Sequence, residues 1–292
     1  MSKTESNIGK KDQYAQFGED GIIENILKTL PDTDKWCVEF GAWDGIKLSN
    51  TYNLIKSKGY KSVLIEADKA KFKALERNMS PYEAILVNEF VEFSGKNTLD
   101  RILAKTPIPK DFDFLSIDID GNDYWILASL CQYRPKVICI EYNPSIPNAV
   151  DYVQPRDFSV SRGSSPSALC RLAKEKSYEL VATTRCNLFF VEKSYFELFS
   201  IVDNSLPGLR DDSDVRIYAF SGYDGTIMHS GQVDMMWHYF KLRRDELQIL
   251  PRFLRTSPSS YNFLQKVVFV VFLFVRAPYE TCRLVRSKLN RA

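Results

Sequence analysis

Residues 38–45, which read VEFGAWDG, decide the fold, because they join an apolar run to a turn that contains two glycines. The run at 36–40 is short and apolar, as expected of a buried strand. Gly41 and Gly45 let the backbone turn sharply and approach a ligand closely. Glu39, at the end of the strand, can accept hydrogen bonds from an amine or a hydroxyl. We therefore interpret this stretch as a nucleotide-cofactor loop.

Apolar runs alternate with helical segments on both sides of this loop. The expected strands are 36–40, 62–65, 84–87, 112–117 and 137–140. The expected helices are 18–30, 49–57, 70–78 and 124–130. Continuous apolar strands that alternate with helices predict an α/β fold with a parallel sheet covered on both faces. Strands at 178–182 and 187–191 leave no room for a crossover helix, so we expect a C-terminal antiparallel hairpin.

The acids at the ends of the first two strands indicate which cofactor the loop binds. Glu66 ends the second strand about 20 residues after Gly45, the interval at which an acid meets a ribose hydroxyl. Glu39 would repel a pyrophosphate but attract an ammonium, which favours S-adenosyl-L-methionine over the dinucleotide of an oxidoreductase. A structural turn with surface acids is the plainer alternative. The residues expected to bind the cofactor here are Glu39, Gly41, Ala42, Asp44, Gly45 and Glu66.

Acidic and amide side chains follow the next strands. Asp118 and Asp120 follow the fourth strand, Glu141 ends the fifth, and Asn143 comes just after it. The carboxyl ends of parallel strands meet at one edge of a sheet, so we expect these groups beside the cofactor, with Asp118 touching it. Oxygen ligands suit Mg²⁺ or another divalent cation, with Asp118, Glu141 and Asn143 as ligands. Hydrogen bonding to backbone or substrate without a metal is the alternative.

The catalytic base is expected among Asp118, Asp120, Glu141 and His229. His229 lies in a turn-rich stretch, 224–231, which we expect to form a loop over the site; a structural role is the alternative.

The segment before the first helix offers three more cofactor candidates, Gln16, Glu19 and Asp20. We expect this segment to fold over the cofactor. The alternative is that the two acids only favour the positive start of the helix.

Four stretches together resemble a known family: 16–21 (QFGEDG), 38–45, 113–121 and 140–141. They look like the FkbM-type S-adenosylmethionine-dependent methyltransferases over roughly residues 13–193. Many members read I-D-V-E-G where this chain has IDIDG at 117–121, and the shorter acid at Asp120 shortens its reach. The resemblance implies a Rossmann-like methyltransferase sheet and an O-methyltransferase, often of polysaccharide or natural-product pathways. The acids also resemble those of metal-dependent catechol-type O-methyltransferases.

Composition bounds the remaining possibilities. The chain has 292 residues, 45% hydrophobic and 26% charged, with a net charge of +2. This is ordinary for a globular protein and gives no basic excess for nucleic acid, which we do not expect as a partner. Six cysteines without a C-x-x-C pair and a polar N-terminus predict a cytoplasmic protein. We expect a methyltransferase core at 1–205, with a loosely attached lead at 1–13, and an appendage at 206–292.

The appendage contains an apolar run at 267–275 with basic flanks. The run is too short to span a bilayer, which needs about 20 residues. Segment 261–291 is therefore expected at the cytoplasmic membrane face, or else buried in the protein or in a homo-oligomer contact. For the whole chain we expect methyl transfer to a small-molecule, sugar or glycan hydroxyl. A non-catalytic adaptor with the same fold is the alternative.

Overall fold

The computed structural model describes residues 14–231, 233–279 and 281–282, so the expected lead at 1–13 lies outside the described residues. The chain forms two compact units that divide between Ser213 and Asp214, C-terminal to the predicted boundary after residue 205.

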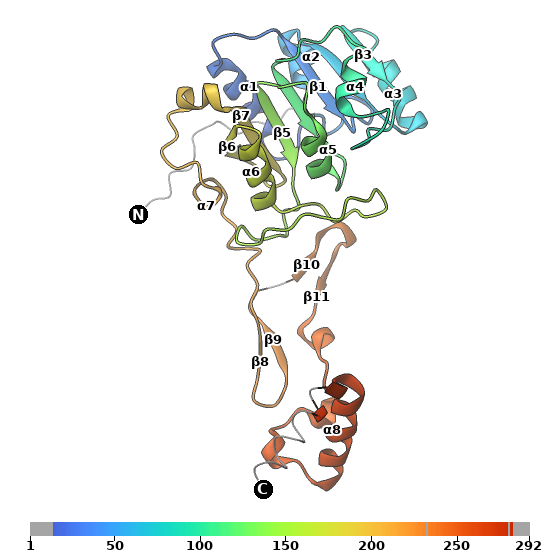
Figure 1. Ribbon diagram of the computed structural model, residues 1–292, viewed down its shortest axis with the longest axis vertical. Coiled ribbons are helices and arrows are strands. Elements are labelled where there is room, and N and C mark those ends of the chain that lie inside the picture. The colour runs from blue at the N-terminus through green and yellow to red at the C-terminus, as the bar shows by residue number, and fades with distance from the viewer. Residues whose placement is uncertain (1–13, 232, 280, 283–292) are drawn as a thin grey trace. The chain divides into compact units, whose positions relative to one another are not determined.

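The first unit is built on a seven-stranded sheet in the order β3-β2-β1-β4-β5-β7-β6 (Figure 1). The strands are β1 Trp36–Phe40, β2 Lys61–Ile65, β3 Ala84–Val87, β4 Phe114–Ile117, β5 Val137–Glu141, β6 Tyr178–Thr183 and β7 Asn187–Glu192. β1 to β5 run parallel, and β7 pairs antiparallel with both β5 and β6. The Rossmann-like methyltransferase sheet with a C-terminal hairpin is therefore confirmed.

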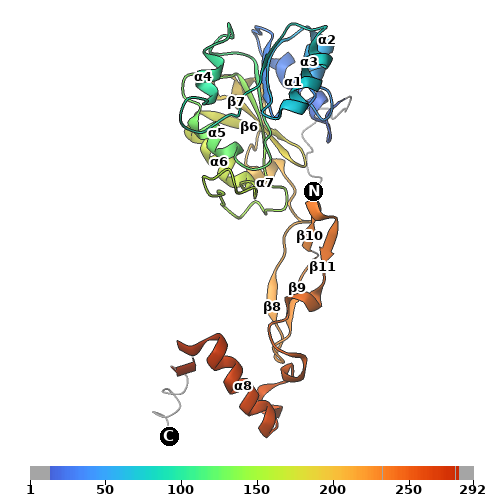
Figure 2. The same cartoon turned by 90° about the vertical axis from the view of Figure 1, so that its right-hand side faces the viewer.

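Helices cover both faces of this sheet, as Figure 2 shows. One face carries α1 Glu19–Thr29, α2 Tyr52–Lys58 and α3 Lys69–Met79. The other face carries α4 Leu99–Leu103, α5 Asp123–Ser129, α6 Pro166–Glu175 and α7 Leu206–Leu209. A 3₁₀ segment, Lys193–Phe199, follows β7. The sequence predicted α1, α2, α3 and α5, whereas α4 and α7 are too short to show a helical period.

Local chemistry explains where these helices begin and end. In α1 the buried residues Ile22, Ile23 and Ile26 recur at helical spacing and face the sheet. In α3 the Asp68 side chain accepts hydrogen bonds from the first free N–H groups, and α6 begins with Ser165 in the same role. Apolar clusters of buried residues lie on both faces of the sheet.

The second unit consists of short elements and one longer helix. They are β8 Ala219–Ser221, β9 Ile227–His229, β10 Val233–Met235, β11 Phe240–Leu242, four 3₁₀ turns (Met236–His238, Arg244–Leu247, Arg252–Leu254 and Pro258–Ser260) and α8 Phe263–Arg276. β8 pairs antiparallel with β9, and β10 with β11. The apolar run at 267–275 lies in α8, in which no residue is buried. Across the described residues, every helix is too short or too polar to cross a bilayer.

Candidate functional site

The site lies where the strand order reverses, between β1 and β4. The chain proceeds from β1 outward to β2 and β3, and β4 then returns to the other side of β1. Connections leave these two strands in opposite directions, and open α/β sheets bind their ligands in the crevice outside the carboxyl ends of such strands. Phe40 pairs with Ile117 across the two strands, so the glycine loop and Asp118 emerge side by side.

The two glycines of the loop are both required, for different contacts. Gly41 has a φ of 77°, and a Cβ built on it would overlap the carbonyl oxygen of Asp118. Gly45 has a φ of 75°, and its Cβ would lie 2.6 Å from Leu75 Cδ1 and 2.9 Å from Met79 Cε. Gly41 therefore lets the loop close on β4. Gly45, expected beside the ligand, instead packs against α3.

The backbone N–H groups of the loop point into the protein. Those of Gly41 and Ala42 donate to the Ile65 carbonyl at 3.1 and 3.2 Å. That of Trp43 donates to Glu66 at 2.9 Å. A loop that binds pyrophosphate presents such groups to the ligand. These three N–H groups of the loop therefore already have partners within the protein.

Glu39 is buried and fully engaged by the chain. Its carboxylate accepts hydrogen bonds from Ser49 Oγ and Thr51 Oγ1, both at 2.6 Å, and from the N–H of Asn50 at 2.8 Å. Burial raises the pKa of Glu39, and these hydrogen bonds oppose the rise. Glu39 thus fixes the connection from β1 to α2. Its contact with a methionine ammonium stays a prediction.

Glu66 and Asp44 also shape the loop. Glu66 is buried, and its two oxygens accept the N–H groups of Trp43 at 2.9 Å and Asp68 at 2.7 Å. Asp44 accepts the N–H groups of residues 46–47 at 2.9 and 2.8 Å. Both acids hold turns at the mouth of the crevice. Ribose binding by Glu66 stays a prediction.

The acids of the N-terminal segment bind the backbone before them. Glu19 accepts the N–H groups of Gln16 at 3.1 Å and Phe17 at 2.6 Å. Asp20 accepts those of residues 14–15 at 2.7 and 3.1 Å. These bonds fold the segment back onto the start of α1, while the side chain of Gln16 is exposed. Their contact with a cofactor stays a prediction.

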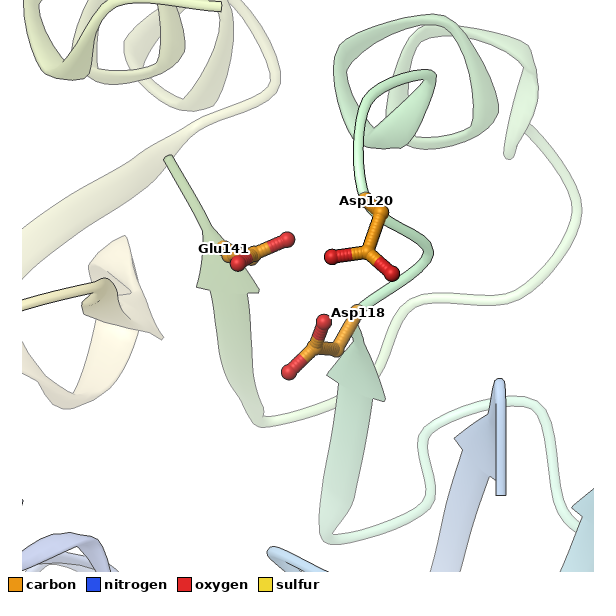
Figure 3. A group of neighbouring side chains, drawn as sticks. All are labelled: Asp118, Asp120 and Glu141. Carbon is orange, nitrogen blue, oxygen red and sulfur yellow. The ribbon is translucent and has the colours of Figure 1, made fainter. Parts of the chain in front are cut away.

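Three carboxylates meet at the ends of β4 and β5, as Figure 3 shows. Asp118, Asp120 and Glu141 each offer an oxygen, and these oxygens lie within 4.8 Å of one another. We call these three residues the acid cluster. Asp120 has a φ of 55° and is held by Asp123, which accepts the N–H groups of Ile119 and Gly121 at 3.0 and 2.9 Å.

Asn143, predicted as the third metal ligand, has other contacts. Its Oδ1 accepts the N–H of Ser145 at 2.9 Å and the Oγ of the same residue at 2.6 Å. Its Nδ2 donates to the Arg162 carbonyl at 2.7 Å. Asn143 thus fixes the loop after β5, and the third acid beside Asp118 and Glu141 is Asp120.

The acid cluster favours positive charge. Burial, reinforced by the neighbouring carboxylates, raises the pKa of Asp118 to about 7 and that of Glu141 to about 10. Burial also raises the pKa of Asp123 to about 6. Glu141 and Asp118 share a hydrogen bond. A proton, a cation or a cationic cofactor would relieve the repulsion among these groups.

His229 ends β9 in the second unit, so it lies on a strand rather than in the expected loop. Its side chain is 5% exposed, and Nδ1 lies 3.2 Å from the Gly231 carbonyl. A catalytic role for His229 stays a prediction.

The sequence did not single out Asn187, which begins β7 directly opposite Glu141. Directly paired residues of neighbouring strands share a face, so this amide lies on the face of Glu141. Its Nδ2 donates to Glu19 at 3.4 Å, and its buried Oδ1 has no partner among the described residues. The register of the hairpin, which no local pattern fixes, was needed to find it.

Arg210 is a second missed residue, buried behind the loop after β5. Its guanidinium donates to the Pro144 carbonyl at 2.8 Å, to Asn148 Oδ1 at 2.6 Å and to the Tyr142 hydroxyl at 3.0 Å. It therefore clamps the loop that follows Glu141. A lone arginine in a long loop region carries no sequence signal for this role.

Comparison with known proteins gives a family match that covers the acid cluster. Residues 91–180 match the family described as the methyltransferase FkbM domain. No curated protein sequence matches the chain.

Several solved methyltransferase structures are similar at low identity. The CurJ carbon methyltransferase is 8% identical with a TM-score of 0.40, over 59% of this chain and 52% of that one. A TehB-like SAM-dependent methyltransferase from Corynebacterium glutamicum is 13% identical with a TM-score of 0.38, over 63% and 90%. CalS10, an amino pentose methyltransferase from Micromonospora echinaspora, is 10% identical with a TM-score of 0.39, over 60% and 89%. This chain spans about half the length of the first of them.

The family match contains Asp118, Asp120 and Glu141 but begins after the glycine loop at 38–45. The assignment of the glycine loop to the site therefore depends on its geometry alone. The assignment of the acid cluster depends on its geometry and on the family match. Residues 91–180 of the chain thus resemble the methyltransferase FkbM domain.

Proposed function

We propose that this protein transfers a methyl group from S-adenosyl-L-methionine to a hydroxyl oxygen, as an O-methyltransferase. The observation that carries the proposal is the acid cluster, whose oxygens lie within 4.8 Å of one another beside the glycine loop. Methylation of a hydroxyl releases a proton, and a nearby carboxylate with a raised pKa is suited to receive it. When bound, the cofactor supplies the electrophilic methyl group.

The residues at the crevice fit such a cofactor. The loop offers no ring of free N–H groups for phosphate, because those of Gly41, Ala42 and Trp43 are bonded within the protein. The acid cluster provides the negative charge that a sulfonium and an ammonium would neutralise. In this proposal Asp118 faces the cofactor. The positive charge of the bound cofactor lowers the pKa of Glu141, so that its carboxylate binds the acceptor hydroxyl and receives the proton that methylation releases.

The acceptor is proposed to be a sugar or a glycan. Carboxylates form short, charge-assisted hydrogen bonds with hydroxyl groups. Several carboxylate oxygens within one small region suit neighbouring hydroxyls of a sugar ring better than a single isolated alcohol. The resemblance to FkbM-type enzymes supports the same class of acceptor.

A divalent cation is a second component of the proposal, supported by the same three carboxylates. Asp118, Asp120 and Glu141 would hold it. All three ligands are oxygens, which suits Mg²⁺. A bound cation would lower the pKa of the acceptor hydroxyl. Activity should then be lost in EDTA and restored by Mg²⁺ or Mn²⁺, whereas full activity in excess EDTA would remove the cation from the proposal.

The test of the reaction is a transfer assay with ¹³C-methyl S-adenosylmethionine and a panel of glycosides and polysaccharides. An O-methyl carbon resonance should appear in the product. Glu141→Gln should reduce the rate at least about 100-fold, as loss of a general base does. Glu197→Gln, at an exposed acid, is the matched control and should keep the rate.

The alternative is a non-catalytic adaptor that keeps the fold. An adaptor should give no methylated product with any acceptor. Any methyl group that appears on nitrogen or carbon would then arise from background chemistry, and Glu141→Gln would leave its rate unchanged. Either outcome would contradict the proposed O-methyl transfer.

A further inference from the structure

The helix α8 exposes a continuous apolar surface. Seven of its side chains are exposed and apolar: Phe263, Leu264, Val267, Val270, Val271, Phe274 and Val275. They recur at intervals of three and four residues, so they share one side of the helix. Phe263 is 83% exposed, Leu264 69% and Val275 81%. We call these seven residues the apolar face.

The opposite side of α8 packs within its own unit. The ring of Phe269 lies 5.4 Å from that of Tyr261, whose hydroxyl donates to the Leu254 carbonyl at 2.6 Å. Gln265 donates to the Phe253 carbonyl at 2.8 Å. The helix is thus held side-on by one flank, and its apolar face turns away from these contacts.

The helix is also sharply bounded, so its length is defined. Asn262 and Gln265 form a reciprocal capping box at the start. The chain leaves α8 at Ala277 and is helical again at Pro278, whose missing N–H prevents it from continuing α8 itself. Fourteen residues extend about 21 Å, less than the roughly 30 Å core of a bilayer. A helix of this length with one apolar side fits an orientation parallel to a membrane surface.

Charge identifies what covers the apolar face. From residue 247 to the C-terminus the sequence has eight basic residues and one acid, Glu280. Arg252, Arg255, Lys266 and Arg276 lie in and around the helix among the described residues. A second copy of the chain would bring like charges together, whereas an anionic membrane surface attracts them. The face itself presents no polar group that would orient a protein partner.

We propose that the apolar face of α8 inserts into the headgroup boundary of a membrane rich in anionic lipid, with the helix lying in the plane of the surface. This inference goes beyond the proposed methyl transfer and does not depend on it. The apolar side chains supply burial, and the basic residues supply attraction to the lipid headgroups.

The experiment is sedimentation of the full chain with vesicles of phosphatidylcholine alone or with added phosphatidylglycerol. Binding should require the anionic lipid. The variant Val271→Glu with Phe274→Glu should bind about tenfold more weakly or worse, because carboxylates oppose insertion. The control, Val202→Glu with Tyr223→Glu, has the same charge change at two fully exposed sites outside α8 and should bind like the wild type.

Two further measurements distinguish insertion from other outcomes. Vesicles should slow amide hydrogen exchange in residues 263–276 and leave the exchange rates of α6 unchanged. Slow exchange in residues 263–276 would also show that α8 is intact. Wild-type chain that does not bind anionic vesicles would overturn the inference. An equal loss of vesicle binding in the two charge variants would also overturn it. A third contradicting result is a wild-type dimer that does not bind vesicles and that dissociates only in the α8 variant.

Discussion

At the scale of single residues, Glu141 and Asp118 make the folding stability of the chain depend on pH. Both carboxyls have pKa values raised in the folded state, to about 10 and about 7. The unfolded chain releases these protons near the ordinary carboxyl pKa, roughly pH 4. Between those limits the unfolded state binds fewer protons than the folded state, so folding stability falls as pH rises. Burial of two neighbouring acids is therefore a cost that a bound cation would offset.

The first prediction follows from this sign. In EDTA, the melting temperature of Glu141→Gln should rise relative to the wild type as pH increases from about 5 to about 9, because the amide cannot ionise. A gain of several degrees is expected, since about 1 kcal/mol moves the melting temperature by roughly 2–4 °C in a chain of this size. Scanning calorimetry measures it. The control Glu197→Gln should differ from the wild type by the same melting temperature at every pH. A constant difference for Glu141→Gln as well would contradict the raised pKa of Glu141.

The second prediction separates backbone strain from steric overlap. Gly41 and Gly59 have similar positive φ values, 77° and 70°, but only a Cβ on Gly41 would meet the carbonyl of Asp118. Gly41→Ala should destabilise the protein by roughly 2–4 kcal/mol more than Gly59→Ala. Urea unfolding of the two variants tests this. Equal losses would mean that the loop does not close on β4 as described.

At the scale of elements, the connection from β1 to α2 depends on one buried acid. Glu39 accepts three hydrogen bonds from residues 49–51. Glu39→Ala should therefore lower the unfolding free energy by roughly 2–4 kcal/mol, because three donors lose their partner. Glu39→Gln, which keeps one acceptor oxygen, should lose less. If thermal melts show both variants at the wild-type value, the acid does not fix this connection.

The strands and the closing hairpin could be predicted because the strands are continuous apolar runs and the link within the hairpin is short and polar. The helix α4 could not, since residues 99–103 make little more than one turn. At the site, strand ends alone were enough to predict that Asp118, Asp120 and Glu141 lie together. The left-handed backbone of Asp120, which Asp123 holds, and the pairing of Asn187 with Glu141 required the structure. Side-chain partners across the fold have no local signature.

At the scale of the whole molecule, the two units divide the predicted roles. The glycine loop and the acid cluster both lie in the first unit, before the division at Ser213. We predict that a chain ending at Ser213 binds S-adenosylmethionine as tightly as the full chain, and that it loses vesicle binding. Calorimetry and sedimentation measure the two properties. Loss of cofactor affinity in a folded truncated chain, judged by circular dichroism, would show that the second unit completes the cofactor site.

The central claim is a cofactor site in the crevice between β1 and β4. Calorimetric titration of the full chain with S-adenosylmethionine and S-adenosylhomocysteine tests it most directly. Both should bind at one site, with affinity kept in Gly59→Ala and at least about tenfold weaker in Gly41→Ala, since the closure of the loop on β4 is then disturbed. Failure of the wild-type chain to bind either compound at millimolar concentration would contradict the claim.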